Sequence, residues 1–169
     1  MTLEELSALE DEARARRELA GRDPAAHLAA LAETLNTLCR KRNSRALRSG
    51  LPGSWDDLLI PYEEAVTVHR TLAGTAPDRF LPGLAESLHN VALPLGEVGR
   101  LPDAVSCREE AVALYRTLAA TDPAGYLPRL GWTLRDLAVD LRELGRGAAS
   151  EAARTEAEHI RRTPAGPAS

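Results

Sequence analysis

The chain repeats part of itself with a period of 46 residues between positions 55 and 146. The string EEAV at 63–66 returns at 109–112, and RTLA at 70–73 returns at 116–119. FLPGL at 80–84 is answered by YLPRL at 126–130, and EVGR at 97–100 is answered by ELGR at 143–146. A period between about 20 and 50 residues is typical of repeat proteins, in which each unit stacks on its neighbours. The sequence therefore predicts a repeat architecture.

Each unit is predicted to be a pair of helices, because the apolar residues are mainly Leu and Ala while aromatic residues make up only 4%. In the predicted first helix of a unit, apolar residues recur at steps of three and four and so share one face. These residues are Leu81, Leu84, Leu88, Val91, Leu95 and Val98 in one unit, and Leu127, Leu130, Leu134, Leu137, Leu141 and Leu144 in the next. Pro82 and Pro128 are expected to separate a short first turn from the main helix.

The sequence predicts an all-α solenoid of antiparallel helix pairs, with about seven helices in a single domain over residues 1–163. A leading helix at 2–20 has a capping box from Thr2 to Glu5 and matches the second helix of a unit whose first helix is missing. Asp23-Pro24 begins unit 1, in which Asp23 caps a helix and residues 48–54 form a loop insertion. The predicted units span 23–73, 76–120 and 122–162, with a disordered tail at 164–169.

The last predicted helix is more polar than its counterparts. Ala157, Glu158, Ile160 and Arg161 stand where the preceding unit has Ala111, Val112, Leu114 and Tyr115. A polar outer face is typical of the terminal repeat of a solenoid, since no further unit covers it. We therefore expect this helix to cap the array.

These features together resemble the tetratricopeptide repeat family. The resemblance rests on Leu-Gly-Arg at the inter-helix turn, Ala111 within the second helix, Tyr115 four residues later, and Asp122-Pro123 before the next unit. The long unit is similar to those of actinobacterial multi-domain signalling ATPases and kinesin light chain-like arrays. It is longer than the usual unit of that family, and unit 1 has Arg45-Ala46-Leu47 where Leu-Gly-Arg is expected. The resemblance implies a right-handed superhelix whose concave groove binds peptides or protein surfaces and carries out no reaction.

No enzymatic chemistry is predicted, and neither a cofactor nor a metal. Glu63-Glu64 recurs as Glu109-Glu110, so this acid pair belongs to the scaffold. His69 and His27 align with aromatic residues and are interpreted as packing residues. Cys39 and Cys107 have no metal-binding neighbours and are interpreted as reduced cytosolic thiols. The sequence contains neither a phosphate-binding G-x-x-x-x-G-K-[ST] loop nor a nucleophile elbow.

The candidate binding residues are those that do not recur. Asn36, His89 and Arg135 share one position of the unit, and Thr37, Asn90 and Asp136 share the next. These residues lie on first helices, which line the groove in the family that the chain resembles. A ladder of them could bind the backbone of an extended peptide; the alternative is ordinary exposed polar residues. Trp132 could anchor a partner or pack against a neighbouring helix.

A basic cluster, the Arg40 patch, consists of Arg40, Lys41, Arg42, Arg45 and Arg48. Clustered arginines can bind an anionic partner, but cations also suit the end of a helix. The formal net charge of −4 and the lack of interleaved aromatic residues argue against nucleic acid. No apolar run is long enough to span a membrane, so we expect a cytoplasmic protein.

Two functions of different classes remain open from the sequence. The first is an interaction scaffold or adaptor that binds a protein or peptide partner in its groove. The second is a self-associating structural module, since the helix at 2–20 exposes a face that a missing helix would cover. A weaker alternative is a detached regulatory or sensor arm of a larger bacterial signalling ATPase.

Overall fold

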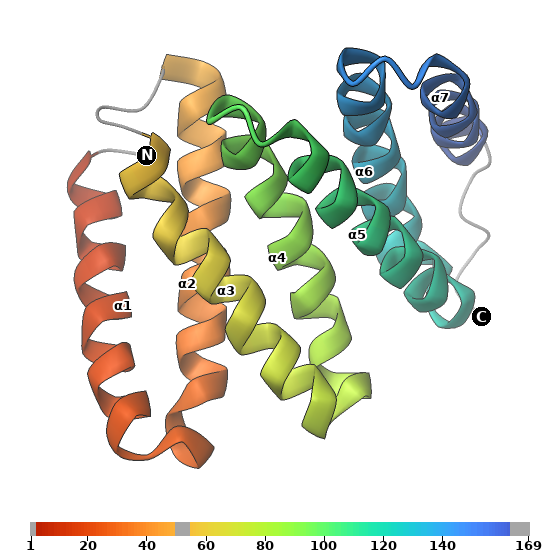
Figure 1. Ribbon diagram of the computed structural model, residues 1–169. Helices are drawn as coiled ribbons and strands as arrows, with labels where there is room; N and C mark the ends of the chain where they lie inside the picture. Colours follow the sequence, from red (N-terminus) through yellow and green to blue (C-terminus); the bar gives the residue numbers. More distant parts are fainter. Residues whose placement is uncertain (1–2, 50–54, 163–169) are drawn as a thin grey trace. The chain divides into compact units, whose positions relative to one another are not determined.

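The computed structural model describes residues 3–49 and 55–162, and over these residues the chain forms seven α-helices. They are α1 (Leu3–Arg22), α2 (Pro24–Ser49), α3 (Trp55–Thr75), α4 (Pro77–Glu97), α5 (Leu101–Thr121), α6 (Pro123–Glu143) and α7 (Gly147–Arg162) (Figure 1). The described residues contain no strand. The predicted all-helical fold is confirmed, and within each compact unit neighbouring helices pack consecutively, consistent with an α-solenoid. We call α2, α4 and α6 the first helices, and α1, α3, α5 and α7 the second helices.

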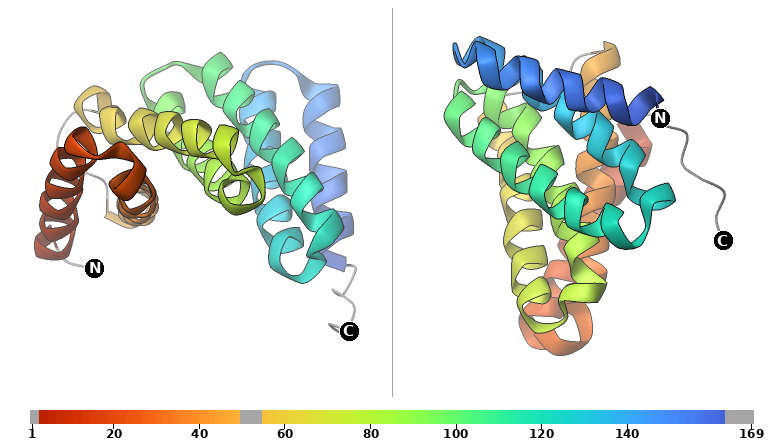
Figure 2. Two further views of the ribbon diagram at one scale, coloured as in Figure 1. Left: turned by 90° about the horizontal axis from the view of Figure 1, so that it is seen from below. Right: turned by 90° about the vertical axis from the view of Figure 1, so that its right-hand side faces the viewer.

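The chain divides into two compact units, Met1–Pro94 and Leu95–Ser169. In the first unit α1 packs on α2 and α2 on α3, while α4 is joined to α2 and α3 by side-chain hydrogen bonds. In the second unit α5 packs on α6 and α6 on α7, as successive antiparallel helices (Figure 2). Each unit therefore builds its core from helix hairpins that are adjacent in sequence.

The three first helices bury the same positions of the repeat. Equivalent residues are 53 apart between α2 and α4 and 46 apart between α4 and α6. The buried sets are Leu31, Thr34, Leu35 and Leu38; Leu84, Ser87, Leu88 and Val91; and Leu130, Thr133, Leu134 and Leu137. Because these sets share steps of one, three and four residues, each forms one helical face. This confirms the apolar face predicted from the sequence.

Each buried set contains one hydroxyl, and each hydroxyl is satisfied within its own helix. The hydroxyls of Thr34, Ser87 and Thr133 donate to the carbonyl four residues earlier at 3.1, 2.8 and 2.9 Å. A buried polar group without a partner costs about 1–3 kcal/mol, so this bond removes that penalty. The repeat therefore accommodates a small polar side chain in its core.

Caps explain where several of these helices begin or end. The Asp23 and Asp122 carboxylates accept the backbone N–H of the third residue after them, at 3.2 and 2.9 Å. Gly99 and Gly145 have φ angles of 80° and 77°, in the left-handed region that favours glycine, and end α4 and α6. At the equivalent position α2 has Ala46 and continues to Ser49. Residues 48 and 49 of the expected loop are therefore helical, while residues 50–54 lie outside the described part.

The prediction that Pro82 and Pro128 separate a short turn is wrong, because α4 and α6 run through both residues. A proline removes one backbone hydrogen bond, and the remaining bonds and the buried face hold the helix. Pro94 shows a specific compensation. Its missing N–H leaves the Asn90 carbonyl without its helical donor, and the Asn43 side-chain amide of α2 donates to that carbonyl at 2.9 Å.

Two equivalent ion pairs join neighbouring second helices. The Arg17 guanidinium of α1 binds both carboxylate oxygens of Glu64 in α3, at 2.7 and 2.5 Å. At the same positions of the second unit, Arg116 of α5 binds both oxygens of Glu156 in α7 at 3.0 and 2.6 Å. This two-point geometry orients the helices, although exposed pairs contribute only about 0.2–1 kcal/mol each.

Replacing two glycines by alanine is expected to change the free energy of unfolding in opposite directions. A Cβ added to Gly83 would lie 2.4 Å from the His69 ring, whereas one added to Gly131 meets only Ile160, at 3.5 Å. Gly131→Ala should stabilise the protein by up to about 1 kcal/mol through helix propensity. Gly83→Ala should destabilise it, because overpacking costs about 1–3 kcal/mol. Urea unfolding of both variants checks this, and effects of the same sign would contradict the described packing.

Candidate functional site

A groove beside several of the predicted binding residues lies between α6 and α7. Its volume is about 540 Å³, and it is lined by Leu127, Pro128, Gly131, Trp132, Arg135, Arg154, Ala157, Glu158, Ile160 and Arg161. The Trp132 side chain is 60% exposed. Trp132 therefore lines an open groove and is not enclosed between packed helices.

The local sequence explains why this groove forms. Trp132 occupies the repeat position of Glu33 in α2 and Glu86 in α4, at the edge of the buried face. Its neighbour Gly131 takes the place of Ala32 and Ala85, and the ordinary contact distance from its Cβ position to Ile160 shows that α7 passes close to it. The large indole consequently projects beside the α6–α7 contact.

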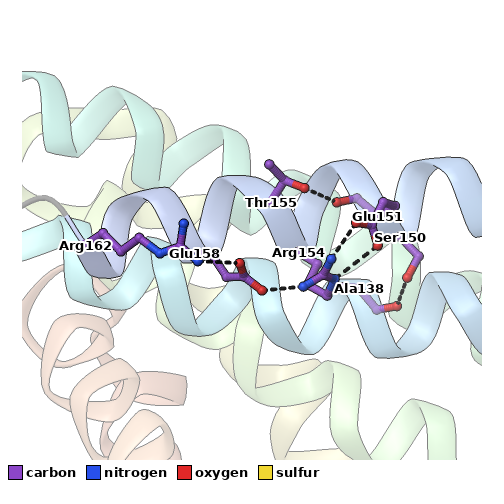
Figure 3. Close-up of polar contacts among 7 residues, drawn as sticks. All are labelled: Ala138, Ser150, Glu151, Arg154, Thr155, Glu158 and Arg162. Carbon is purple, nitrogen blue, oxygen red and sulfur yellow. Dashed lines mark hydrogen bonds and ion pairs between the residues drawn. The ribbon is translucent and has the colours of Figure 1, made fainter.

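Charged side chains border the groove along α7. The Arg154 guanidinium is held between Glu151, at 2.5 Å, and Glu158, which also pairs with Arg162 at 3.2 Å (Figure 3). Ser150 donates to the Ala138 carbonyl of α6 at 2.6 Å and fixes the start of α7 against α6 (Figure 3). Across the groove, Arg135 lies 3.5 Å from the carboxylate of Asp136. Trp132, Arg135 and Asp136 are therefore on one exposed side of α6.

The predicted binding residues of the first unit are less accessible. Asn36 is only 6% exposed, and Asn90 is also buried, with its side-chain Nδ2 lacking a hydrogen-bond acceptor among the described residues. His89 is half-buried. The proposed ladder of exposed polar side chains therefore does not describe α2 and α4, where the asparagines serve contacts between helices.

Asn36 belongs to a buried polar cluster with His69 and Ser87. The Asn36 amide donates to the Gly83 carbonyl at 3.0 Å and lies 3.4 Å from His69 Nε2. The Ser87 hydroxyl lies 2.8 Å from Asn36 Oδ1 and 2.9 Å from His69 Nδ1. His69 Nδ1 is 2.9 Å from the Ala65 carbonyl, which can only accept, so Nδ1 carries the proton and Nε2 is the acceptor.

This cluster has a serine, a histidine and an amide, but its geometry does not suit nucleophilic catalysis. A base must have a free lone pair facing the hydroxyl. The Nδ1 atom near Ser87 instead carries a proton, which it donates to the Ala65 carbonyl. Burial lowers the pKa of His69, and the Ala65 carbonyl opposes this. We therefore interpret the cluster as a structural joint among α2, α3 and α4. A pocket of about 420 Å³ opens beside it, edged by Arg79, Phe80 and Glu86.

The Arg40 patch does not form one open surface. Arg40 pairs with Glu86 of α4 at 3.0 Å, and Arg42 is only 8% exposed and pairs with Glu10 of α1 at 2.6 Å. Arg45 is half-buried, and Lys41 is exposed. Arg48 lies in α2, and its side chain is outside the described residues. Arg40 and Arg42 therefore point to different helices.

The remaining candidates for chemistry are metal-binding clusters and the cysteines. Within residues 3–49 and 55–162, no group of three His, Cys, Asp or Glu side chains is placed to hold a metal ion. Cys39 is buried, and burial raises the pKa of its thiol far above the ordinary value. None of the described helices has the length and apolar character needed to cross a membrane.

The comparisons with known proteins bear on the fold. No protein-family model matches the chain, and no curated protein matches it. The chain is similar in structure to BtubC (BKLC) from P. vanneervenii, with a TM-score of 0.61 and 21% sequence identity. The match covers 95% of this chain and 57% of BtubC, so this chain spans little more than half the length of that protein. At this identity the similarity supports a shared helical fold.

The stability of the protein is expected to fall when the pH is lowered, because His69 then becomes protonated in the unfolded chain. Because the folded-state pKa is lowered, the unfolded state binds more protons below the ordinary value of about 6.5. The stabilisation is thus complete above that pH and is lost as pH falls towards the folded pKa.

Urea unfolding at about pH 7.5 and about pH 5.5 measures this loss. His69→Gln should flatten the dependence. An equally steep dependence in His69→Gln would show that His69 is not the group responsible.

Proposed function

We propose that the chain is a non-enzymatic interaction scaffold of the tetratricopeptide type, which binds a protein or peptide partner. The observation that carries this proposal is the exposed Trp132 in the α6–α7 groove. Tryptophan and arginine are the side chains that most often dominate binding energy at protein interfaces. Trp132 and Arg135 meet that description, and neither is needed to fill the core.

The fold also supports a binding role over a catalytic one. The buried hydroxyls and His69 are satisfied by contacts within the helix array. Asn36, which the sequence suggested as a peptide ligand, is engaged by Gly83. The side chains that remain accessible include those of the α6–α7 groove, where apolar and charged groups lie next to one another. As part of this proposal we place the protein in the cytoplasm, where the thiols of Cys39 and Cys107 would stay reduced.

A second candidate function is self-association through α1. Leu3 and Leu19 of this helix are both exposed large apolar residues, and burying either of them against a second copy would remove it from water. This candidate and the first differ in whether the isolated chain is a monomer.

Trp132→Ala is expected to abolish partner capture without unfolding the chain, because the removed indole is mostly outside the core. Affinity purification from the source cells, compared by quantitative mass spectrometry, measures this. Ile60→Ala is the matched control, since Ile60 is an equally exposed apolar residue on α3. Identical captured proteins for wild type and Trp132→Ala would contradict a role for this groove.

A further inference from the structure

The first unit shows how a first helix covers the hairpin before it. Three side chains of α2 hold α4: Asn36 donates to the Gly83 carbonyl, Arg40 pairs with Glu86, and Asn43 donates to the Asn90 carbonyl, at 3.0, 3.0 and 2.9 Å. His69 of α3 meets Ser87 of α4 at 2.9 Å. We call positions 36, 40, 43 and 69 the covered footprint of the α2–α3 hairpin.

The α6–α7 hairpin carries the same footprint without a cover. The equivalents of positions 36, 40, 43 and 69 are Arg135, Val139, Arg142 and Arg161. All four are exposed, and Val139 is an apolar residue with 40% of its surface accessible. In the described part of the second unit, no helix therefore covers these four positions, although α4 covers their equivalents in the first unit.

Arg108 in the second unit shows how a covering helix changes the surroundings of an arginine on a second helix. Arg108 of α5 is covered by α6: its side chain is 7% exposed and pairs with Asp140. Burial raises the pKa of Asp140 against the opposing effect of Arg108, as expected for a carboxylate removed from water. Arg154 holds the equivalent position in α7 and is 53% exposed. A helix that covers α7 should likewise bring carboxylates to it.

We propose that the α6–α7 groove, together with the exposed residues Val139 and Arg142 further along α6, binds an acidic amphipathic α-helix of another protein, seated as α4 is seated on α2 and α3. Its carboxylates pair with Arg135, Arg142 and Arg161, and its apolar residues pack on Trp132 and Val139. This inference rests on the proposed function and specifies the partner.

Spacing favours a helix as the occupant over an extended peptide. The α2 contacts lie at steps of four and three residues, and the α4 contacts at Gly83, Glu86 and Asn90 lie at steps of three and four. Such steps are one face of a helix laid along another. The α6 positions keep the same steps, so they match the helix-in-groove mode of recognition.

Charge favours an acidic occupant. Among the described residues, the side chains of Arg142 and Arg161 form neither an ion pair nor a hydrogen bond, although the whole chain has a net charge of −4. Glu151 and Glu158 are engaged by Arg154 and Arg162, and they pair with neither Arg142 nor Arg161. In the first unit one arginine in the footprint is met by one glutamate of α4. Three arginines in the equivalent seat call for several carboxylates on the covering helix.

A second copy of the chain is the competing occupant, because α1 contains several acidic residues. Two of these, Asp11 and Glu12, are already paired with Arg14 and Arg16 on the same helix, at 3.0 and 2.6 Å. The outward face of α1 therefore mixes both charges and complements a basic groove poorly.

The test is a displayed library of helical peptides about 20 residues long, randomised along one helical face and selected on the intact chain. We expect enrichment of Asp and Glu at steps of three and four. An enriched peptide should bind Arg135→Glu/Arg161→Glu at least about tenfold more weakly. A version of this peptide in which Lys replaces the enriched Asp and Glu should bind the Arg135→Glu/Arg161→Glu variant again. Arg22→Glu, at an exposed site on α1, is the matched control and should bind as wild type does.

Selection of neutral, basic or extended peptides, or equal affinity of wild type and the double variant, would overturn the inference. A selection that enriches no peptide would also overturn the inference. Sedimentation velocity decides about a second copy: oligomers of the chain alone that Arg135→Glu/Arg161→Glu disperses would also overturn it. If Trp132→Ala abolishes partner capture while acidic helices are not preferred, the proposed function stands and only the helix inference fails. If Trp132→Ala leaves capture unchanged, both fail.

Discussion

The structure depends on the covering of each second helix by the first helix that follows it. A helix hairpin buries one apolar face between its own helices and leaves another open, and each buried Leu or Val side chain is worth about 1.5–3 kcal/mol. Stacking the next first helix removes the open face from water, which is why repeats are stable only as arrays. In this chain α4 covers α3 and α6 covers α5. Within residues 55–162 no helix follows α7 to cover it, and α7 lines the α6–α7 groove.

Polar contacts decide which helices fit together. Asn43 supplies the hydrogen bond that Pro94 removes from the Asn90 carbonyl, so a proline in α4 becomes a point of attachment to α2. Gly83 leaves room for the His69 ring, and Ser87 satisfies its hydroxyl beside that ring. Apolar stripes alone would allow neighbouring helices to slide, whereas these directional bonds fix one position. In the last hairpin the positions of Asn43 and His69 carry Arg142 and Arg161, which are both exposed.

The sequence predicted the helices well because their cause is local. Steps of three and four along α4 and α6 follow from the 3.6-residue turn, and Gly99 and Gly145 end those helices through their own φ angles.

The candidate site was harder to predict. Asn36 and Asn90 looked exposed because the pattern beside an apolar stripe does not show which neighbour lies against it. The burial of Arg42 depends on Glu10, which is 32 residues away in the chain. Trp132 could be singled out, because it replaces a glutamate of the repeat, but its exposure depends on the absence of a covering helix.

The measurement that tests this account most directly compares two ion pairs whose arginines occupy the same repeat position. Double-mutant cycles for Arg108–Asp140 and Arg154–Glu158, measured by chemical unfolding, isolate each coupling energy. We predict about 1.5–3 kcal/mol for the pair covered by α6 and no more than about 0.5 kcal/mol for the exposed pair on α7. A coupling energy for Arg154–Glu158 equal to that of Arg108–Asp140 would mean that the α7 face is already shielded from water, and would contradict the open seat on which the account is built.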